Sequence, residues 1–489
     1  MSVDYAALAP EIVISAAACL LVVVDLALRG RTRVLAGWFG FTAVVLAFLL
    51  TIPLLNSGHR TTLAGMFVVD DFAVVLKLFF LAVAAFTIWI SIPPMRGHRY
   101  EGEFVFLLLC SVLGTMLMPS SRDLLMLFIA LELVSAPAFV IAGLRKLNPR
   151  SNEAALKFFI FGVLSAGVLV YGISLVYGFT GTTSLVRIGN KLLTTSAEPL
   201  LLVGIVFIVA AFGFKVSAVP FHFWAPDTYE GAPTPLAAFL SVASKAAGFV
   251  GLLLILLIAF PALSSFWGPI LGGIAVATMT IGNVIALRQR HLIRLLAYSS
   301  IGHAGYMLIP VAVIGPHTGL ITGTNAQLVR SLVIYLVVYA VMNLGAFAVA
   351  IGASKQYPTL LVRDLAGLGR RAPLPALALA GFLISLGGIP PFAGWFAKFA
   401  VFIAAINAGS GLGVVLAVAM VVNSVISLYY YVSVIRVMYL SDPEDAGAVS
   451  FPRPITIAVG AALAGVIVLG VYPEPFAKMA NAARLLLSG

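Results

Sequence analysis

Four ionisable residues lie near the middle of long apolar stretches. Glu132 lies in LLMLFIALELVSAPAFVIAG, Lys215 before VSAVPFHFW, Lys245 in AAFLSVASKAAGFVGLLLIL, and Lys398 in GGIPPFAGWFAKFAVFIAAI. A charge at the centre of a bilayer costs about 2.5 to 17 kcal/mol, so such residues usually face a protein interior or water and serve a function. One alternative is buried ion pairing that only fixes helix packing, but one glutamate cannot pair with three lysines.

The chemistry that suits these residue types is proton transfer. Burial favours the neutral forms of lysine and glutamate, whereas a nearby opposite charge favours the ionised forms. A Lys–Glu pair can therefore be poised so that a small change in separation moves a proton, and coupled groups titrate as a set. A sodium site would instead need several oxygen ligands, and lysine is a poor neighbour for such a cation.

Histidines and hydroxyls extend the predicted relay. His222 follows Lys215 by seven residues, about two turns of a continuous helix and thus the same face. His303 lies in YSSIGHAGY, where Tyr298, Ser299, Ser300 and Tyr306 offer hydroxyls that can hold water or pass protons. We predict His222 as a relay residue and His303, Tyr298 and Ser299 as further candidates. The alternative for each histidine is a hydrogen-bonded packing role.

Prolines interrupt two of the apolar stretches close to the buried lysines. Pro220 offers no N–H to the carbonyl of Val216, and Pro390, which Pro391 follows, offers none to that of Leu386. Carbonyls left unpaired at membrane depth need water or side chains as partners. We therefore predict helix breaks with local polar pockets at both places; the alternative is a simple kink.

The composition identifies the solvent of this chain as lipid. Of its 489 residues, 62% are hydrophobic and 10% are charged, against roughly 25% charged in soluble proteins. Two isolated cysteines, Cys19 and Cys110, give no cluster or disulfide framework, and no dinucleotide or P-loop motif is present. The sequence thus predicts no cofactor, metal or nucleic-acid site in this chain.

We predict an all-α polytopic membrane protein with about fourteen transmembrane helices, the seventh and twelfth broken by proline. The predicted spans are 9–28, 35–55, 71–92, 102–119, 123–143, 154–178, 199–223, 233–259, 266–287, 293–314, 328–352, 374–406, 409–438 and 454–472. The N-terminal stretch has no basic region before its apolar run, so we interpret it as a retained helix and not as a cleaved signal peptide.

Lysine and arginine are distributed unequally between the connecting loops. Loops after odd-numbered spans contain Arg29, Arg31, Arg33, Arg96, Arg99, Arg145, Lys146, Arg150, Arg288, Arg290, Lys355, Arg363, Arg370 and Arg371. Loops after even-numbered spans contain little beyond Arg60, Arg122, Arg187 and Lys191. The positive-inside rule then predicts odd loops in the cytoplasm and both termini outside.

A faint internal repeat divides the chain. PFHFW at 220–224 is followed by PFAGW at 391–395. Each repeat unit has five spans, an odd number, so consecutive units enter the membrane from opposite sides and the second is inverted relative to the first. Inverted repeats with broken helices at matching positions are typical of transporters. We predict an N-terminal three-helix segment (1–101), a first repeat (102–259), a second, inverted repeat (266–438) and a C-terminal helix with a short tail (439–489).

Three long motifs resemble a known family. PFHFWAPDTYEGAPTPLAAFLSVASKAAGF, LLAYSSIGHAGYML and GIPPFAGWFAKFAVF are similar to the antiporter-like membrane subunits of respiratory complex I, and within that group to the subunit N family of bacterial NADH–quinone oxidoreductases. The resemblance covers essentially the whole chain. One departure is Ile293, where relatives often carry a lysine before the arginine that matches Arg294.

The resemblance implies fourteen helices with two inverted repeats and a site in the membrane arm of a bacterial inner-membrane complex. The partners would be the sister subunit M and the small quinone-proximal subunits. NADH, FMN, iron–sulfur clusters and quinone would be used by other subunits. The family's central residues match Glu132, Lys215, Lys245 and Lys398, with His222 also matching.

The leading hypothesis is proton translocation driven by quinone reduction elsewhere in the complex. In it, Glu132 and Lys215 form a switchable pair, protonation passes by way of His222 and water to Lys245, and Lys398 delivers the proton outward. One alternative is a subunit of a multisubunit cation/proton antiporter. Another is a structural scaffold whose charges only pack the membrane arm.

Overall fold

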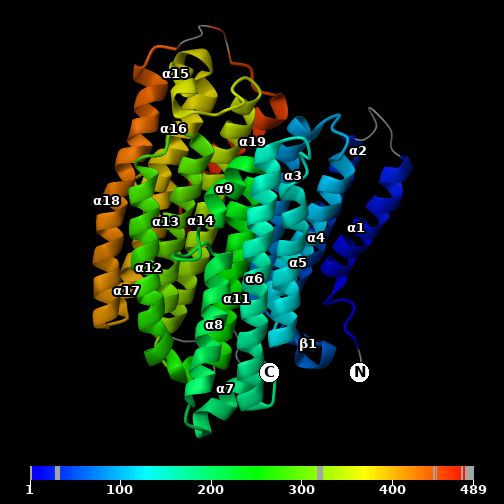
Figure 1. Cartoon of the computed structure of the whole chain (residues 1–489), viewed down its shortest axis with the longest axis vertical. Coiled ribbons are helices and arrows are strands. Elements are labelled where there is room, and N and C mark those ends of the chain that lie inside the picture. The colour runs from blue at the N-terminus through cyan, green and yellow to red at the C-terminus, as the bar shows by residue number, and fades with distance from the viewer. Residues whose placement is uncertain are drawn as a thin grey trace.

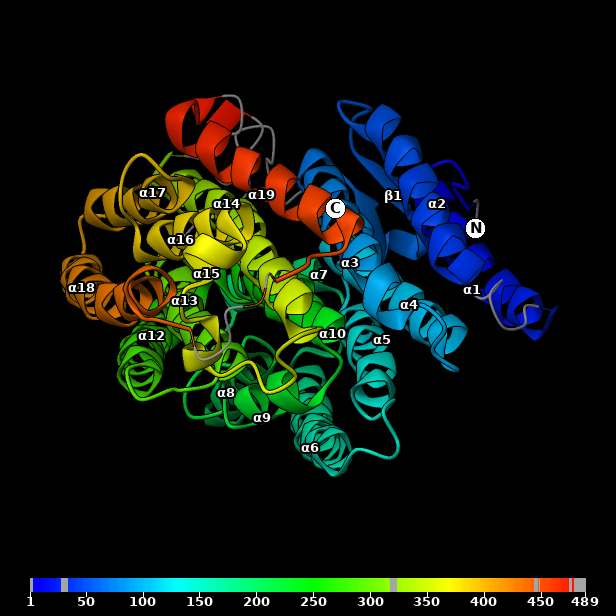
Figure 2. The same cartoon turned by 90° about the horizontal axis from the view of Figure 1, so that it is seen from above.

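The computed structural model describes residues 3–27, 34–316, 323–443, 447, 449–474 and 477–478. Most helices run along the long axis of the molecule (Figure 1). Viewed from above, α1 and α2 lie at one edge of the bundle and α18 lies at the opposite edge (Figure 2). Twelve of the described helices are long and apolar enough to cross a membrane.

Every predicted span has a helical counterpart in the described residues. The uninterrupted spanning helices are α1 (Ala9–Ala27), α2 (Val34–Thr51), α3 (Asp71–Met95), α4 (Glu101–Ser120), α5 (Leu124–Ala142), α6 (Pro149–Thr180), α12 (Ser264–Ala286), α13 (Leu292–Ala312), α14 (Gly323–Ser354), α18 (Gly411–Leu440) and α19 (Arg453–Val471). The all-helical polytopic fold expected from hydropathy is therefore confirmed.

The two predicted helix breaks are confirmed as well. The seventh span, predicted at 199–223, contains α8 (Pro199–Lys215), and Pro220 lies in the non-helical segment between α8 and α9 (Trp224–Gly231), a short helix that follows the span. The twelfth consists of α16 (Pro373–Gly387) and α17 (Ala393–Asn407), separated by a segment that holds Pro390 and Pro391. Each break contains a cis peptide bond, at Val219–Pro220 and at Pro390–Pro391.

The eighth span is the central element of the bundle. It runs through α10 (Thr234–Phe239), the π-helical turn η4 (Leu240–Ser244), α11 (Lys245–Leu254) and a second π-helical turn, η5 (Ile255–Ala259). Its most apolar window is entirely buried inside the protein. It packs against α4, α5, α8, α13 and α14, so a side chain on it is shielded from lipid on all sides.

Short elements connect the spans. They are the antiparallel hairpin of β1 (Arg60–Thr62) and β2 (Phe67–Val69), the helices α7 (Leu185–Thr194) and α15 (Leu368–Arg371), and the single turns η2 (Ile52–Leu54), η3 (Leu63–Gly65), η6 (Pro261–Leu263) and η7 (Val362–Leu365). Helix α7 lies at the end of the bundle opposite to α15 (Figure 1). Its apolar residues Leu185, Ile188 and Leu192 are buried against η5 and η6.

Helix pairing is similar in the two halves of the chain. Helix α4 packs on α5 as α12 packs on α13, and α6 packs on α8 as α14 packs on α16. This pattern fits the expected repeats, but the boundaries at 1–101, 102–259, 266–438 and 439–489 stay a prediction. Most of the short tail beyond α19 lies outside the described residues.

Close helix contact provides a test of the packing. A Cβ atom at Gly282 of α12 would lie 2.6 Å from the backbone nitrogen of Gly302 of α13, whereas one at Gly273, also on α12, meets nothing within 4 Å. We expect Gly282→Ala to destabilise the protein by about 1–3 kcal/mol through overpacking. Gly273→Ala is the matched control and should leave the thermal melting point of the solubilised protein unchanged or slightly higher. Equal melting points for the two variants would contradict this packing.

Candidate functional site

Lys215 is the last residue of α8, directly before the first helix break. Its side chain is buried, and its Nζ donates a 2.7 Å hydrogen bond to Oγ of Ser135 on α5. Glu132 lies one turn before Ser135 and is half-buried. The charge of Lys215 acts on the Glu132 carboxylate, although no ion pair within 4.0 Å joins these two described residues. The two groups are therefore coupled without being locked together.

Lys245 begins α11 immediately after the π-helical turn η4. Its Nζ donates hydrogen bonds to the backbone carbonyl of Ser300 (3.0 Å) and to its Oγ (2.9 Å) on α13. Only 2% of Lys245 is exposed. Helix irregularities of this kind are frequent at functional sites, and here the turn lies beside a buried amine at the centre of the bundle.

A hydroxyl–imidazole cluster follows Ser300 along α13. Nδ1 of His303 lies 2.8 Å from the hydroxyl of Tyr335 on α14, and Nε2 lies 3.3 Å from the hydroxyl of Tyr431 on α18. The Tyr431 hydroxyl is also 2.5 Å from Oγ of Ser299. All four side chains are buried. Since each group can donate or accept, the cluster can conduct a proton between α13, α14 and α18.

Lys398 lies on α17, past the second helix break. Its Nζ donates a 2.9 Å hydrogen bond to the carbonyl of Gly387, the last residue of α16, and lies 5.0 Å from the ring centre of Tyr306 on α13. The Tyr306 hydroxyl accepts a 3.0 Å hydrogen bond from Asn283. The broken helix thus provides the oxygen that binds the buried amine, because terminal carbonyls of a helix lack intrahelical partners.

The structure brings these groups into one connected series. The aliphatic part of Lys215 packs on Gly248, where an added Cβ would lie 3.0 Å from its Cγ, and Gly248 follows Lys245 by three residues on the same helix. Lys245 binds Ser300, His303 and Tyr306 follow Ser300 at three-residue intervals on α13, and Nζ of Lys398 lies 5.0 Å from the Tyr306 ring centre. Lys215, Lys245, His303 and Lys398 therefore follow one another through the interior of the bundle.

Two candidate residues are not joined to this series. The α8 helix ends at Lys215, so the seven-residue spacing does not place His222 on the same helix face. His222 is buried, its ring lies 4.5 Å from that of Phe223, and Nδ1 has no hydrogen-bond partner among the described residues. Tyr298 is half-buried against the apolar core, and no hydrogen bond links it to His303 or to a lysine in the described chain. The roles of His222 and Tyr298 stay predictions.

Sequence reasoning missed three hydrogen-bond partners of the predicted residues. Ser135 binds Lys215, Tyr335 contacts His303, and Tyr431 contacts Ser299. Ser135 has a usable signal, because it follows Glu132 by one helical turn. Tyr335 and Tyr431 have none, since each lies on a helix that is distant in sequence from the residue it contacts.

Metal ligation has no structural support in the described part of the chain. There, no group of three or more His, Cys, Asp and Glu side chains converges on a common point. The two cysteines are far apart in sequence and are not bonded to each other.

An ionic cluster lies where α9 meets α6 and α13. Arg294 donates to Asp227 (2.7 Å) and to Glu230 (2.9 Å), and Lys157 donates to Asp227 (2.7 Å). Burial raises the pKa of Asp227, but hydrogen bonds and charges from Lys157 and Arg294 outweigh burial, so this pKa lies below its ordinary value. Asp227 is thus an ionised bridge between three helices.

Comparisons with known proteins agree on one family. Residues 121–427 match the family described as NADH:quinone oxidoreductase/Mrp antiporter, TM. The chain is 40% identical to NADH-quinone oxidoreductase subunit N 2 of Streptomyces griseus, over 98% of this chain and 94% of that protein. It is 37% identical to F(420)H(2) dehydrogenase subunit N of Methanosarcina mazei, over 98% of each chain.

A solved structure supports the same assignment. A chain of respiratory complex I from Thermus thermophilus with bound aureothin is 30% identical and superposes with a TM-score of 0.80, covering 96% of this chain and 99% of that chain. The chain belongs to the subunit N family of NADH-quinone oxidoreductases. The family resemblance found in the sequence motifs is thereby confirmed, together with the antiporter-like fold.

The ionic cluster of this subunit N family member gives a pH-dependent prediction. Because the pKa of Asp227 is lower in the folded than in the unfolded protein, its stabilising effect is complete above about pH 4 and is lost as the pH falls through the folded pKa. We expect Asp227→Asn to destabilise the solubilised protein by about 1 kcal/mol near neutral pH. The melting-point gap between wild type and variant should close as the pH is lowered toward 3.

The control is Asp442→Asn, which removes a pair with Arg370 in which both side chains are largely exposed. Such pairs contribute little, so its melting point should match that of wild type at every pH. A gap for Asp227→Asn that does not change with pH would contradict the role of its ionised carboxylate.

Proposed function

We propose that this chain, as a membrane subunit of an NADH:quinone oxidoreductase complex, translocates protons through its series of buried lysines, driven by quinone reduction in other subunits. The observation that carries the proposal is the bonding of the three amines. Lys215, Lys245 and Lys398 are at most 8% exposed, and each donates only to neutral oxygens, of Ser135, Ser300 and Gly387. No described carboxylate lies within 4.0 Å of any of them.

This bonding argues against a purely structural role. Buried ammonium groups are tolerated in packing roles when carboxylates compensate them, as Glu11 does for Lys77 at 2.8 Å elsewhere in the chain. The three central lysines lack such compensation, so their protonation can change at modest cost. Lys77 provides an internal contrast, because it is equally buried but paired.

Unpartnered polar groups support the transfer of protons between the lysines. Among the described residues, buried oxygens of Ser217, Ser244, Tyr229 and Tyr339 have no hydrogen-bond partner in the protein. Native proteins rarely leave such groups unsatisfied, and ordered water is their usual partner. In the proposed relay, Glu132 and Lys215 form the switchable pair, Lys245 and the His303 cluster carry the proton onward, and Lys398 releases it. His222 would assist at the first break.

The uptake side of the relay is proposed at the ionic cluster of α9. The side chains of Asp227 and Glu230 are partly exposed and bind Arg294, and Ser300 lies six residues after Arg294 on α13, about 9 Å along the helix. Tyr229, from α9 between the two carboxylates, places its buried hydroxyl beside Ser300 without hydrogen-bond geometry. The Tyr229 ring therefore lies between the ionic cluster and Ser300, the hydrogen-bond partner of Lys245.

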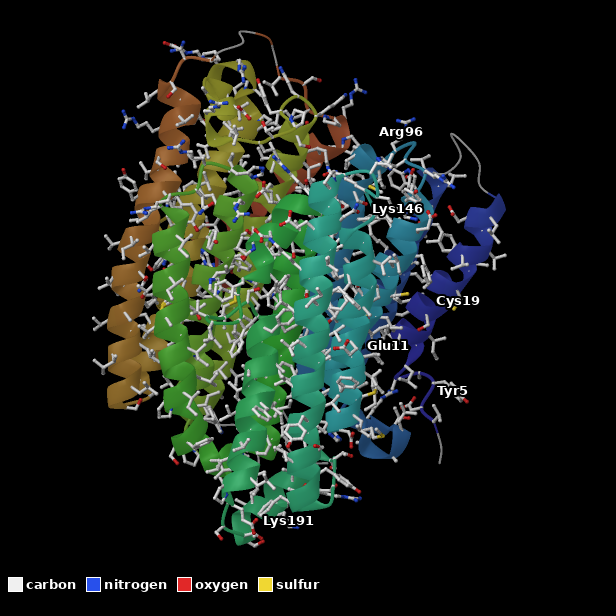
Figure 3. All side chains as sticks on the ribbon, viewed as in Figure 1. Tyr5, Glu11, Cys19, Arg96, Lys146 and Lys191 are labelled. Carbon is white, nitrogen blue, oxygen red and sulfur yellow. The ribbon has the colours of Figure 1, made fainter. Side chains whose placement is uncertain are left out.

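The proposed direction is from the cytoplasm to the outside of a bacterial inner membrane. Arg96 and Lys146 lie near one end of the bundle, and Lys191 lies at the other (Figure 3). Arg29, Arg31 and Arg33 lie outside the described residues. By the positive-inside rule the Arg96 end is cytoplasmic, which puts both termini outside. Sister subunit M and small quinone-proximal subunits are the proposed partners, and coupling would reach the relay through Glu132.

A cation/proton antiporter subunit is the competing assignment, since the family model includes Mrp antiporters. A cation site needs several convergent oxygens, and the oxygens of Ser135, Ser300 and Gly387 are already bound by amines. We therefore favour proton translocation alone. Translocation that depends on sodium ions would reverse this preference.

The decisive variant is Lys245→Met in the assembled complex, which keeps the volume of the side chain and removes the amine. We expect NADH-driven proton translocation to fall by roughly tenfold or more, because a positioned proton-transfer group contributes about 10² to 10⁴ in rate. Fluorescence quenching of a pH dye in vesicles measures the pumping, and native electrophoresis measures assembly.

The control is Lys355→Met, which removes an exposed amine after α14 and should leave pumping unchanged. Lys245→Arg should also impair pumping, since arginine does not release its proton. Normal pumping by a fully assembled Lys245→Met complex would refute the relay.

A further inference from the structure

Arg330 is a charged residue inside a membrane span that the relay does not use. It follows the first residue of α14 by seven positions, about 10 Å along the helix. Its side chain is partly exposed and lines a surface cleft between α14 and α17. Among the described residues it forms no salt bridge and no hydrogen bond, unlike Arg122, which is held by Asp70 at 2.6 Å.

A guanidinium near the end of a membrane span is stabilised by an anionic partner. Arginine remains protonated under all ordinary conditions, and a charge facing lipid costs several kcal/mol unless it is paired or reaches the interface. Arg330 lines a surface cleft and has no hydrogen-bond or ion-pair partner among the described residues, so a bound anion would compensate its charge.

The cleft has one polar and one apolar part. Gln327 and Arg330 form the polar part, near the beginning of α14, and Ile334, Phe396 and Phe399 form the apolar part. Gln327 accepts a 3.2 Å hydrogen bond from Asn407, the last residue of α17, so the polar part lies at the membrane-surface end of both helices. The apolar part extends toward the middle of the span. The cavity volume is about 210 Å³.

The donors in the polar part suit a phosphate. Arg330 provides a planar set of N–H groups that match phosphate oxygens, and the amide nitrogen of Gln327 remains free to donate because its oxygen accepts from Asn407. Ser331 already donates to the carbonyl of Leu328 at 2.7 Å. The cleft therefore offers two donor groups next to an apolar wall.

We propose that this cleft binds one anionic glycerophospholipid, with its phosphodiester on Arg330 and Gln327 and an acyl chain along Phe396 and Phe399. A membrane phospholipid places its phosphate at the interface and its chains toward the midplane, which is the order of polar and apolar residues in the cleft. A carboxylate from a neighbouring subunit would satisfy Arg330 but would leave the apolar wall without a matching group. The proposal is independent of the proton relay.

The test uses the complete complex, stripped of loosely bound lipid and titrated with phosphatidylglycerol under native mass spectrometry. We expect Arg330→Gln to retain about one phosphatidylglycerol fewer than wild type, or to bind it roughly tenfold more weakly, as expected for loss of one charge-assisted hydrogen bond. Arg330→Lys should retain most of the binding. Arg363→Gln, which removes an equal charge from an exposed site after the other end of α14, is the matched control and should bind as wild type does.

Two further experiments distinguish a bound phospholipid from free phosphate and from a carboxylate of a neighbouring subunit. Phe399→Ser should weaken phosphatidylglycerol binding, and inorganic phosphate alone should not displace the lipid. Displacement by inorganic phosphate at comparable concentration would show a simple anion site and overturn the lipid assignment. Loss of a neighbouring subunit in Arg330→Gln, with unchanged lipid binding, would identify a partner carboxylate and overturn it as well.

Discussion

The burial of three lysines without carboxylate partners is the constraint on which the rest of this structure depends. Each amine must be bound by oxygens that the fold provides, since an unsatisfied ammonium in a low-dielectric interior is strongly unfavourable. Lys215 and Lys245 use serines of α5 and α13, and Lys398 uses the terminal carbonyl of α16. Neutral oxygens satisfy both the amine and the ammonium form, whereas a carboxylate would hold the charged form. In the proposed relay, neutral oxygen partners would therefore keep the protonation of the three lysines reversible.

The irregular parts of the helices serve this constraint. A regular helix consumes its own carbonyls, so a buried amine on a straight span finds few acceptors. The break after Gly387 releases a carbonyl for Lys398. Beside the break after Lys215, the carbonyl of Phe214 accepts from the backbone nitrogen of Ser217 and from the indole of Trp224, both at 3.0 Å. A π-helical turn directly precedes Lys245. In most helices a proline is simply destabilising. In this protein, prolines lie at both helix breaks, where backbone groups become available close to the buried lysines.

The sequence predicted these features to different extents, for physical reasons. A charge or a proline in an apolar run is unusual and is visible in the sequence alone, so the lysines, Glu132 and both helix breaks could be found without a structure. Serine and tyrosine are common in membrane helices, and the pairing of Ser299 with Tyr431 joins positions 132 residues apart. Helix α7 was missed because its ten residues are too few to span the membrane. The periodicity used for His222 assumed a helix that in fact ends at Lys215.

The arrangement of like charges suggests how protons are ordered along the series. His303 experiences the charges of both Lys245 and Lys398, and like charges in a poorly screened interior disfavour each other. A proton arriving at Lys245 therefore makes a second charge on His303 less favourable, and a proton leaving Lys398 makes it more favourable. Such groups titrate as a set. In the proposed relay, release from Lys398 and uptake at Lys245 would thus be linked through His303 by electrostatics.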